Sequence, residues 1–106
     1  APIVHERVGR LDLAGGNAAQ PSYVLRKSVT TIGRGPDNDI VLRDNLASRH
    51  HARVMEYSGE YFLHDLDSVN GSRVNRERLD GPVRLRSGDE IVIGSVRLLF
   101  SLVDSG

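Results

Sequence analysis

The residues best suited to chemistry lie in three short polar segments. Gly33 and Arg34 end an apolar run, Ser48 and Arg49 follow a link rich in turn residues, and Asn70 comes about twenty residues later. A phosphate monoester near neutral pH carries about 1.5 to 2 negative charges and three strong acceptor oxygens. Arginine offers such a group a charge-assisted pair of hydrogen bonds, and a serine hydroxyl adds a short donor. Arg34, Ser48 and Arg49 are therefore candidates to hold a phosphate.

Asn70 has a different chemistry from these three residues. Its amide both donates and accepts hydrogen bonds, so it suits a peptide backbone better than a phosphate. Gly71 follows it and permits the positive φ that a tight turn at this point requires. Together the segments predict a site for a phosphate and for the peptide beside it. A plain surface ion pair with Asp37 or Asp39 is the alternative for Arg34 taken alone.

Short β-prone runs separated by turn residues must position these segments. The expected strands cover residues 3–13, 23–26, 30–33, 40–42, 52–56, 61–64, 74–75, 83–85, 90–93 and 96–102. Residues 57–60 and 94–95 are expected to close hairpins, and residues 14–21, with two glycines and a proline, to form a mobile loop. No stretch has a convincing helical pattern. Some ten short strands predict an all-β sandwich with binding loops at its end.

Length and composition limit the possible functions. A chain of 106 residues has room for one domain, and the absence of cysteine excludes disulfides and thiolate metal sites. Zero net charge argues against nucleic-acid binding. The most apolar run, residues 96–103, contains an arginine and is too short to span a bilayer. We therefore expect an intracellular domain, without membrane contact of its own, excised from a longer protein.

Arginine accounts for thirteen of the fourteen basic residues. Its planar fork fits carboxylate and phosphate groups better than the ammonium of lysine does. A GC-rich genome would produce the same bias, so the count alone does not decide between the two explanations.

The spaced motifs of the chain resemble those of the forkhead-associated (FHA) domain over residues 3–103. The pieces that carry the resemblance are Gly33-Arg34, the run from Ser48 to Ala52, the run from Asp65 to Asn75, and Gly88-Asp89. Each piece is weak alone, but all of them in this order and spacing form a specific pattern. The resemblance implies an eleven-stranded β-sandwich that recognises phosphothreonine in an extended peptide. It implies a signalling adaptor rather than an enzyme, with no cofactor and no metal.

The resemblance also assigns roles to individual residues. Arg34 and Ser48 are expected to contact the phosphate with help from Arg49, and Asn70 to grip the peptide backbone. Four residues are expected to support the loops: Gly33, His51, Gly71 and Ser72. The loop before Ser48 is expected to recognise the third residue after the phosphothreonine, and it consists of Asp44, Asn45, Leu46 and Ala47. The implied partner is a Thr-phosphorylated protein, such as a Ser/Thr kinase or its substrate.

Two positions depart from the family pattern. Val69 replaces a hydroxyl residue that commonly precedes the asparagine, which removes a polar contact. Ser72 replaces the usual threonine, which is a milder change because the hydroxyl is kept.

Three other functions are compatible with parts of the sequence. A metal hydrolase could use a set of ligands consisting of His50, His51, His64 and Asp65, but adjacent residues of an extended segment face opposite sides. Ser48 near His51 could act as a nucleophile, but no oxyanion-hole loop or nucleophile elbow accompanies it. A sandwich that binds partners through a sheet face without any phosphate is the third.

Overall fold

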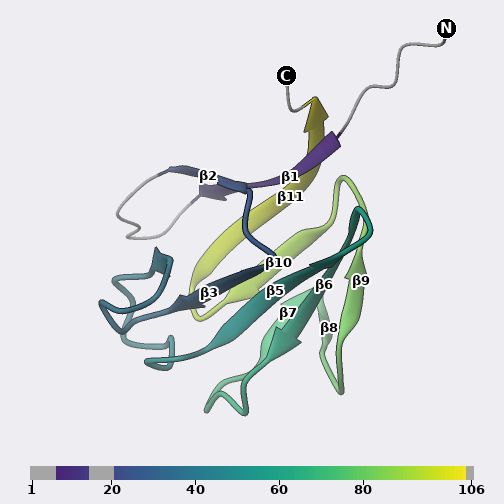
Figure 1. Cartoon of the computed structure of the whole chain (residues 1–106). Helices are drawn as coiled ribbons and strands as arrows, with labels where there is room; N and C mark the ends of the chain where they lie inside the picture. The colour runs from purple at the N-terminus through teal and green to yellow at the C-terminus, as the bar shows by residue number, and fades with distance from the viewer. Residues whose placement is uncertain (1–6, 15–20, 105–106) are drawn as a thin grey trace, which may run out of the picture.

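The computed structural model describes residues 7–14 and 21–104 and shows two β-sheets that pack together around one core (Figure 1). It has eleven strands, and the described residues contain no helix. In this part of the chain, no helix is therefore long and apolar enough to cross a membrane. The predicted all-β sandwich of about eleven strands is confirmed.

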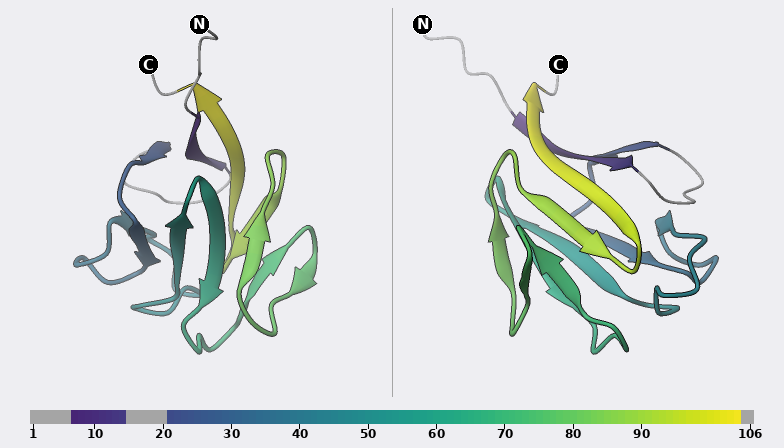
Figure 2. Two further views of the ribbon diagram at one scale, coloured as in Figure 1. Left: turned by 45° about the vertical axis from the view of Figure 1, so that its right-hand side comes forward. Right: turned by 180° about the vertical axis from the view of Figure 1, so that it is seen from behind.

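The first sheet has six strands and brings the two ends of the described chain together. Its order is β2-β1-β11-β10-β7-β8. The strands are β1 (Arg7–Ala14), β2 (Ser22–Leu25), β7 (Ser72–Val74), β8 (Glu77–Arg78), β10 (Glu90–Ile93) and β11 (Val96–Asp104). β1 and β11 pair antiparallel over their full common length, from Arg7 opposite Asp104 to Ala14 opposite Arg97. The right-hand view of Figure 2 shows these two strands from behind, next to each other near the chain ends.

The second sheet has five strands, and its register gathers the polar loops at one end. Its order is β4-β3-β5-β6-β9. The strands are β3 (Val29–Gly33), β4 (Ile40–Val41), β5 (Ala52–Tyr57), β6 (Glu60–Asp65) and β9 (Val83–Leu85). Ile32 of β3 lies opposite Ala52 of β5, and Ala52 lies opposite Asp65 of β6. The loops that follow β3, precede β5 and follow β6 therefore leave the sheet side by side (lower left in Figure 1).

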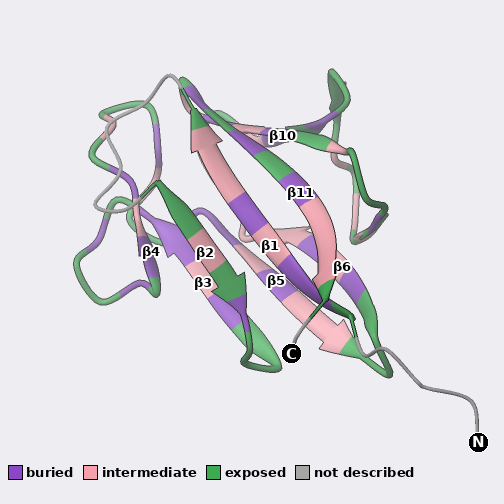
Figure 3. Ribbon diagram, turned by 90° about the horizontal axis from the view of Figure 1, so that it is seen from above, coloured by how far each residue is buried: buried purple, intermediate pink, exposed green. Residues whose placement is uncertain are grey.

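Alternating side chains build the core between the sheets. In β11, the buried residues Val96, Leu98 and Phe100 alternate with the exposed residues Arg97 and Leu99. Figure 3 shows this alternation as bands along β11. Each large apolar side chain that is fully buried contributes about 1.5–3 kcal/mol relative to an exposed one.

A short strand that the sequence pattern does not predict is β8. It pairs with β7 through a two-residue turn, Asn75-Arg76, in which φ is 50° and 74°. Such turns favour glycine at their second position, and the arginine there hides the hairpin signal. The expected strand at residues 74–75 is therefore wrong at its C-terminal end, since Asn75 belongs to the turn.

The hairpin between β5 and β6 is tighter than predicted. Both strands continue to the turn Ser58-Gly59, where φ is 50° and 82°. The predicted turn at Gly94-Ser95 is confirmed, since Ile93 pairs directly with Val96. Residues 3–6 of the expected first strand and residues 15–20 of the expected mobile loop lie outside the described residues.

Gly9 of β1 gives a test of core packing. A Cβ at this position would lie 2.9 Å from a ring carbon of Phe100 and 3.0 Å from the ring of Tyr61. We expect Gly9→Ala to lower the free energy of unfolding by about 1–3 kcal/mol, as overpacked core substitutions do. Urea unfolding measures the change.

The matched control is Gly81→Ala, because a Cβ there would meet no atom within 4 Å. It should leave stability unchanged or slightly raised, because alanine restricts the unfolded chain. Equal effects of the two substitutions would contradict the packing argument.

Candidate functional site

Backbone hydrogen bonds hold the loop after β3 against the loop before β5. The amide of Arg34 donates to the carbonyl of Ser48 (2.9 Å), and the amide of Gly35 donates to the carbonyl of Arg49 (3.0 Å). Gly33 permits this approach, because a Cβ there would lie 2.2 Å from the carbonyl oxygen of Arg49. The pairing brings Arg34 and Ser48 together at the end of the sandwich.

Asn38 locks the same two loops and was not singled out from the sequence. Its Nδ2 donates to the carbonyls of Gly35 and Arg49, both at 2.7 Å, and only 7% of the residue is exposed. The sequence signal was its place in a dense turn cluster, which indicates a turn but not its partner across the loops. The backbone of Arg49 thus serves the framework while its side chain remains exposed.

His51 joins the second loop to the third. The residue is fully buried, its Nδ1 accepts a hydrogen bond from the amide of Ser48 (3.0 Å), and its Nε2 lies 2.8 Å from the carbonyl oxygen of Gly71. Since an amide donates to Nδ1 and a carbonyl can only accept, these contacts assign the neutral tautomer with the proton on Nε2. One imidazole therefore sets the spacing between two of the three loops.

Asp65 organises the third loop from its first residue. Its carboxylate accepts hydrogen bonds from the hydroxyls of Ser68 (2.6 Å) and Ser72 (2.7 Å) and from the amide of Ser68 (3.0 Å). Partial burial raises the pKa of Asp65, but these hydrogen bonds outweigh burial and hold the pKa below its ordinary value. The turn closes at Gly71, where φ is +78°. Asp65 stands in the quoted motif, but its supporting role was not predicted.

The donors of Arg34 and Ser48 remain open to a ligand. Nε of the exposed Arg34 side chain donates to the carbonyl of Ala47 (3.2 Å), and its two terminal nitrogens have no hydrogen-bond partner among the described residues. The hydroxyl oxygen of Ser48 accepts from the amide of Val69 (3.1 Å), so its own proton is free to donate outward. Arg34 and Ser48 therefore present unused donors from a fixed frame.

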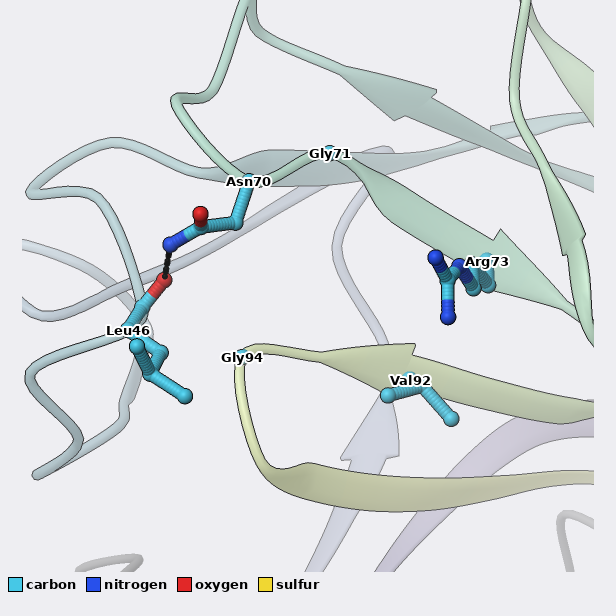
Figure 4. A pocket seen from close by; sticks show the side chains of 6 residues that line it. All are labelled: Leu46, Asn70, Gly71, Arg73, Val92 and Gly94. Carbon is cyan, nitrogen blue, oxygen red and sulfur yellow. Dashed lines mark hydrogen bonds between the residues drawn. The ribbon is translucent and has the colours of Figure 1, made fainter.

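Asn70 stands at the edge of an open pocket of about 280 Å³ (Figure 4). Its Nδ2 donates to the carbonyl of Leu46 (2.9 Å), which leaves its side-chain oxygen available to accept from a peptide amide. The pocket is lined by Leu46, Asn70, Gly71, Arg73, Val92 and Gly94. Val69, whose amide donates to the Ser48 hydroxyl oxygen, precedes Asn70 in the chain and so links the pocket to Ser48.

The structure gives different environments to the four residues of the loop before Ser48. Asp44 anchors the loop, since its carboxylate accepts from the amide of Leu46 (2.9 Å) and from the amide (2.7 Å) and hydroxyl of Ser95. The hydrogen bond from the Ser95 side chain, and then that from the Leu46 amide, lower the pKa of Asp44. Ala47 is buried, Asn45 is exposed, and Leu46 alone lines the pocket.

The alternative sets of residues are not assembled as their chemistry requires. His50 is exposed and contacts Asp37 at 2.8 Å, while His51 is buried on the other side of the chain. Within the described residues, no group of three or more His, Cys, Asp or Glu could hold a metal ion. His51 contacts the amide of Ser48 and not its hydroxyl. Asp37 and Asp39 pair with His50 and Lys27 rather than with Arg34.

Comparison with known proteins agrees with this geometry. The sequence matches the family model of the FHA domain over residues 30–94. The glycogen accumulation regulator GarA of Mycolicibacterium smegmatis is 44% identical over 85 residues, which cover 80% of this chain and 53% of that protein. The oxoglutarate dehydrogenase inhibitor of Corynebacterium diphtheriae is 41% identical over 92 residues, which cover 87% of this chain and 64% of that protein. This chain therefore spans less than two thirds of each relative.

A solved structure supports the same assignment. It comes from a structural and functional analysis of phosphothreonine-dependent FHA domain interactions and superposes with a TM-score of 0.81 at 31% identity. The match covers 89% of this chain and 95% of that chain. The fold shared with that structure, the motif spacing and the match to the family model lead to one conclusion: this chain belongs to the forkhead-associated (FHA) domain family.

Proposed function

We propose that this domain binds phosphothreonine peptides and acts as a signalling adaptor. The observation that carries the proposal is the pair of open donors, the Arg34 guanidinium and the Ser48 hydroxyl, on loops joined by backbone hydrogen bonds. A phosphate dianion accepts from both without displacing any internal partner of their donor hydrogens. Because the loops are already ordered, binding costs little conformational entropy.

Each remaining site residue has a role in this proposal. The exposed Arg49 side chain adds a second cation near the phosphate. The free side-chain oxygen of Asn70 accepts from a peptide amide, which holds the ligand extended across the loops. Gly33, His51, Gly71 and Ser72 keep these groups in place through the contacts described above.

Binding rather than catalysis is the function that the FHA family supports, and the similar proteins named above are described as a regulator and an inhibitor. We infer that the partner is a Thr-phosphorylated protein, such as a Ser/Thr kinase or its substrate, inside the cell.

Three matched peptides test the function. They differ only in carrying phosphothreonine, phosphoserine or unmodified threonine, and calorimetric titration compares them at one pH and one salt concentration. We expect binding to require the phosphate and to favour phosphothreonine several-fold. One buried methyl is worth about 0.8 kcal/mol, and the stiff χ1 of threonine adds to it. Equal binding of all three would support the phosphate-independent sandwich instead.

Arg34 should be the principal phosphate ligand. Truncating one partner of a desolvated charge pair costs about 2–5 kcal/mol, so Arg34→Ala should weaken binding by at least about thirtyfold. Arg34→Lys should restore only part of the affinity, because lysine keeps the charge but loses the fork. Arg84→Ala is the control, since Arg84 is exposed and pairs with Glu60 on β6. Wild-type affinity in Arg34→Ala would remove Arg34 from the site.

His51 should couple stability to affinity. His51→Ala leaves the Ser48 amide without its acceptor, which costs about 1–3 kcal/mol, and it also frees the third loop. Urea unfolding and peptide titration of the same variant should therefore both show a loss. The exposed His50 is the control, and His50→Ala should change neither quantity strongly. Full stability with abolished binding would make His51 a direct ligand rather than a support.

A further inference from the structure

Three arginines share one row across four strands of the six-stranded sheet. Arg97 of β11 lies opposite Val92 of β10, Val92 lies opposite Arg73 of β7, and Arg73 lies opposite Arg78 of β8. Adjacent strands lie about 4.8 Å apart, so the row from Arg97 to Arg78 extends roughly 15 Å across the sheet. We call these three residues the arginine row.

The arginine row faces away from the core. Arg73 is exposed between the buried Ser72 and Val74, and Arg97 is exposed between the buried Val96 and Leu98. Residues that alternate with buried neighbours along a strand point to the opposite face. Figure 4 shows Arg73 and Val92 beside each other at the pocket. The row therefore forms part of the outer surface of the sandwich.

The row carries an uncompensated positive charge. Among the described residues, Arg73, Arg78 and Arg97 make no ion pair. The alternating pattern places Glu90 on the same face of β10 as Val92, and the Asp44 carboxylate lies beside Gly94, so two negative charges near the row stand against three positive ones. Like charges directly opposite each other on paired strands are destabilising, and Arg73 and Arg78 stand in that relation. An anion bound over them would remove this repulsion.

The row is continuous with the proposed peptide site. Arg73 lines the same pocket as Asn70 and Leu46. Arg78 reaches back over the loop, since its Nε lies 2.8 Å from the position of a Cβ on Gly71. Arg73 follows Asn70 by three positions in the chain, which corresponds to at most about 10 Å. A peptide that leaves Asn70 across the pocket therefore meets Arg73 within about three of its own residues.

We propose that the arginine row is a second anion site, which binds acidic groups in the partner segment that follows the phosphothreonine. The anions are carboxylates or a second phosphate, since both accept the two parallel hydrogen bonds of a guanidinium. The inference rests on the proposed function. We place the acidic groups after the phosphothreonine rather than before it. Leu46 lines the same pocket as Arg73, and it belongs to the loop that is expected to contact residues after the phosphothreonine. Positions three to six after the phosphothreonine span the distance from Arg73 to Arg97.

Four phosphothreonine peptides test the proposal. The reference peptide, called the neutral peptide, carries no charged residue besides the phosphothreonine. The second carries glutamates at positions three to six after the phosphothreonine, and the third carries the same glutamates before it. The fourth carries a single phosphoserine at position four after it. In the wild-type domain at low salt, the glutamates placed after the phosphothreonine should strengthen binding by about fivefold, the scale of a few exposed ion pairs. The phosphoserine arm shows whether a phosphate serves as well as carboxylates.

The variant Arg73→Gln/Arg97→Gln should lose this gain, measured against the affinity of the same variant for the peptide without glutamates, because Arg73 lines the pocket. Arg78 is left intact because it packs over Gly71. The control Arg7→Gln/Arg84→Gln removes the same charge from exposed sites away from the pocket and should keep the gain. Arg97→Gln alone leaves every pocket residue in place, and it should lose part of the affinity gained from the glutamates. Thermal melting of each variant verifies folding.

The proposal is overturned if the glutamates add no affinity, if they add as much when placed before the phosphothreonine, or if the gain survives in the double variant. These outcomes are distinct from failure of the proposed function. If the neutral peptide binds without requiring its phosphate, the proposed function fails, and the arginine row no longer has an adjoining phosphothreonine site.

Discussion

The buried imidazole of His51 is the interaction on which the binding end depends. It accepts from the amide of Ser48 and donates to the carbonyl of Gly71, so it links the loop before β5 to the loop after β6. Burial of an imidazole is tolerated here because both nitrogens are hydrogen-bonded. Had either partner been missing, the ring would leave a polar atom unpaired at a cost of about 1–3 kcal/mol.

Strand register makes that link possible. Because Ile32, Ala52 and Asp65 lie in one row of the five-stranded sheet, three loops begin or end at the same level. A shift of one residue in any of these pairings would turn the core-facing side chains outward. The apolar core therefore enforces the alignment of the strand ends from which the polar loops leave the sheet.

Much of this arrangement could be predicted from the sequence, and the rest depends on contacts that no pattern encodes. Alternating apolar residues indicated ten of the eleven strands, and the motif spacing indicated which loops meet. β8 was missed because Arg76 occupies a left-handed position that usually favours glycine. The roles of Asn38 and Asp65 follow only from partners across the loops. The arginine row follows only from register, since Arg73, Arg78 and Arg97 are scattered in the sequence.

The proposed site separates the groups that hold the loops from those that are available to a ligand. His51, Asn38 and Asp65 use their polar atoms on internal partners, whereas the terminal nitrogens of Arg34 and the hydroxyl proton of Ser48 are left unused. Changes to the first set act on the fold and reach affinity through it. Changes to the second set act mainly on affinity, and each removes one further contact, from Arg34 to the carbonyl of Ala47 or from the amide of Val69 to Ser48. Arg73 and Arg97 make none of the hydrogen bonds that hold the loops, so a change in their charge should leave the frame around Arg34 and Ser48 intact.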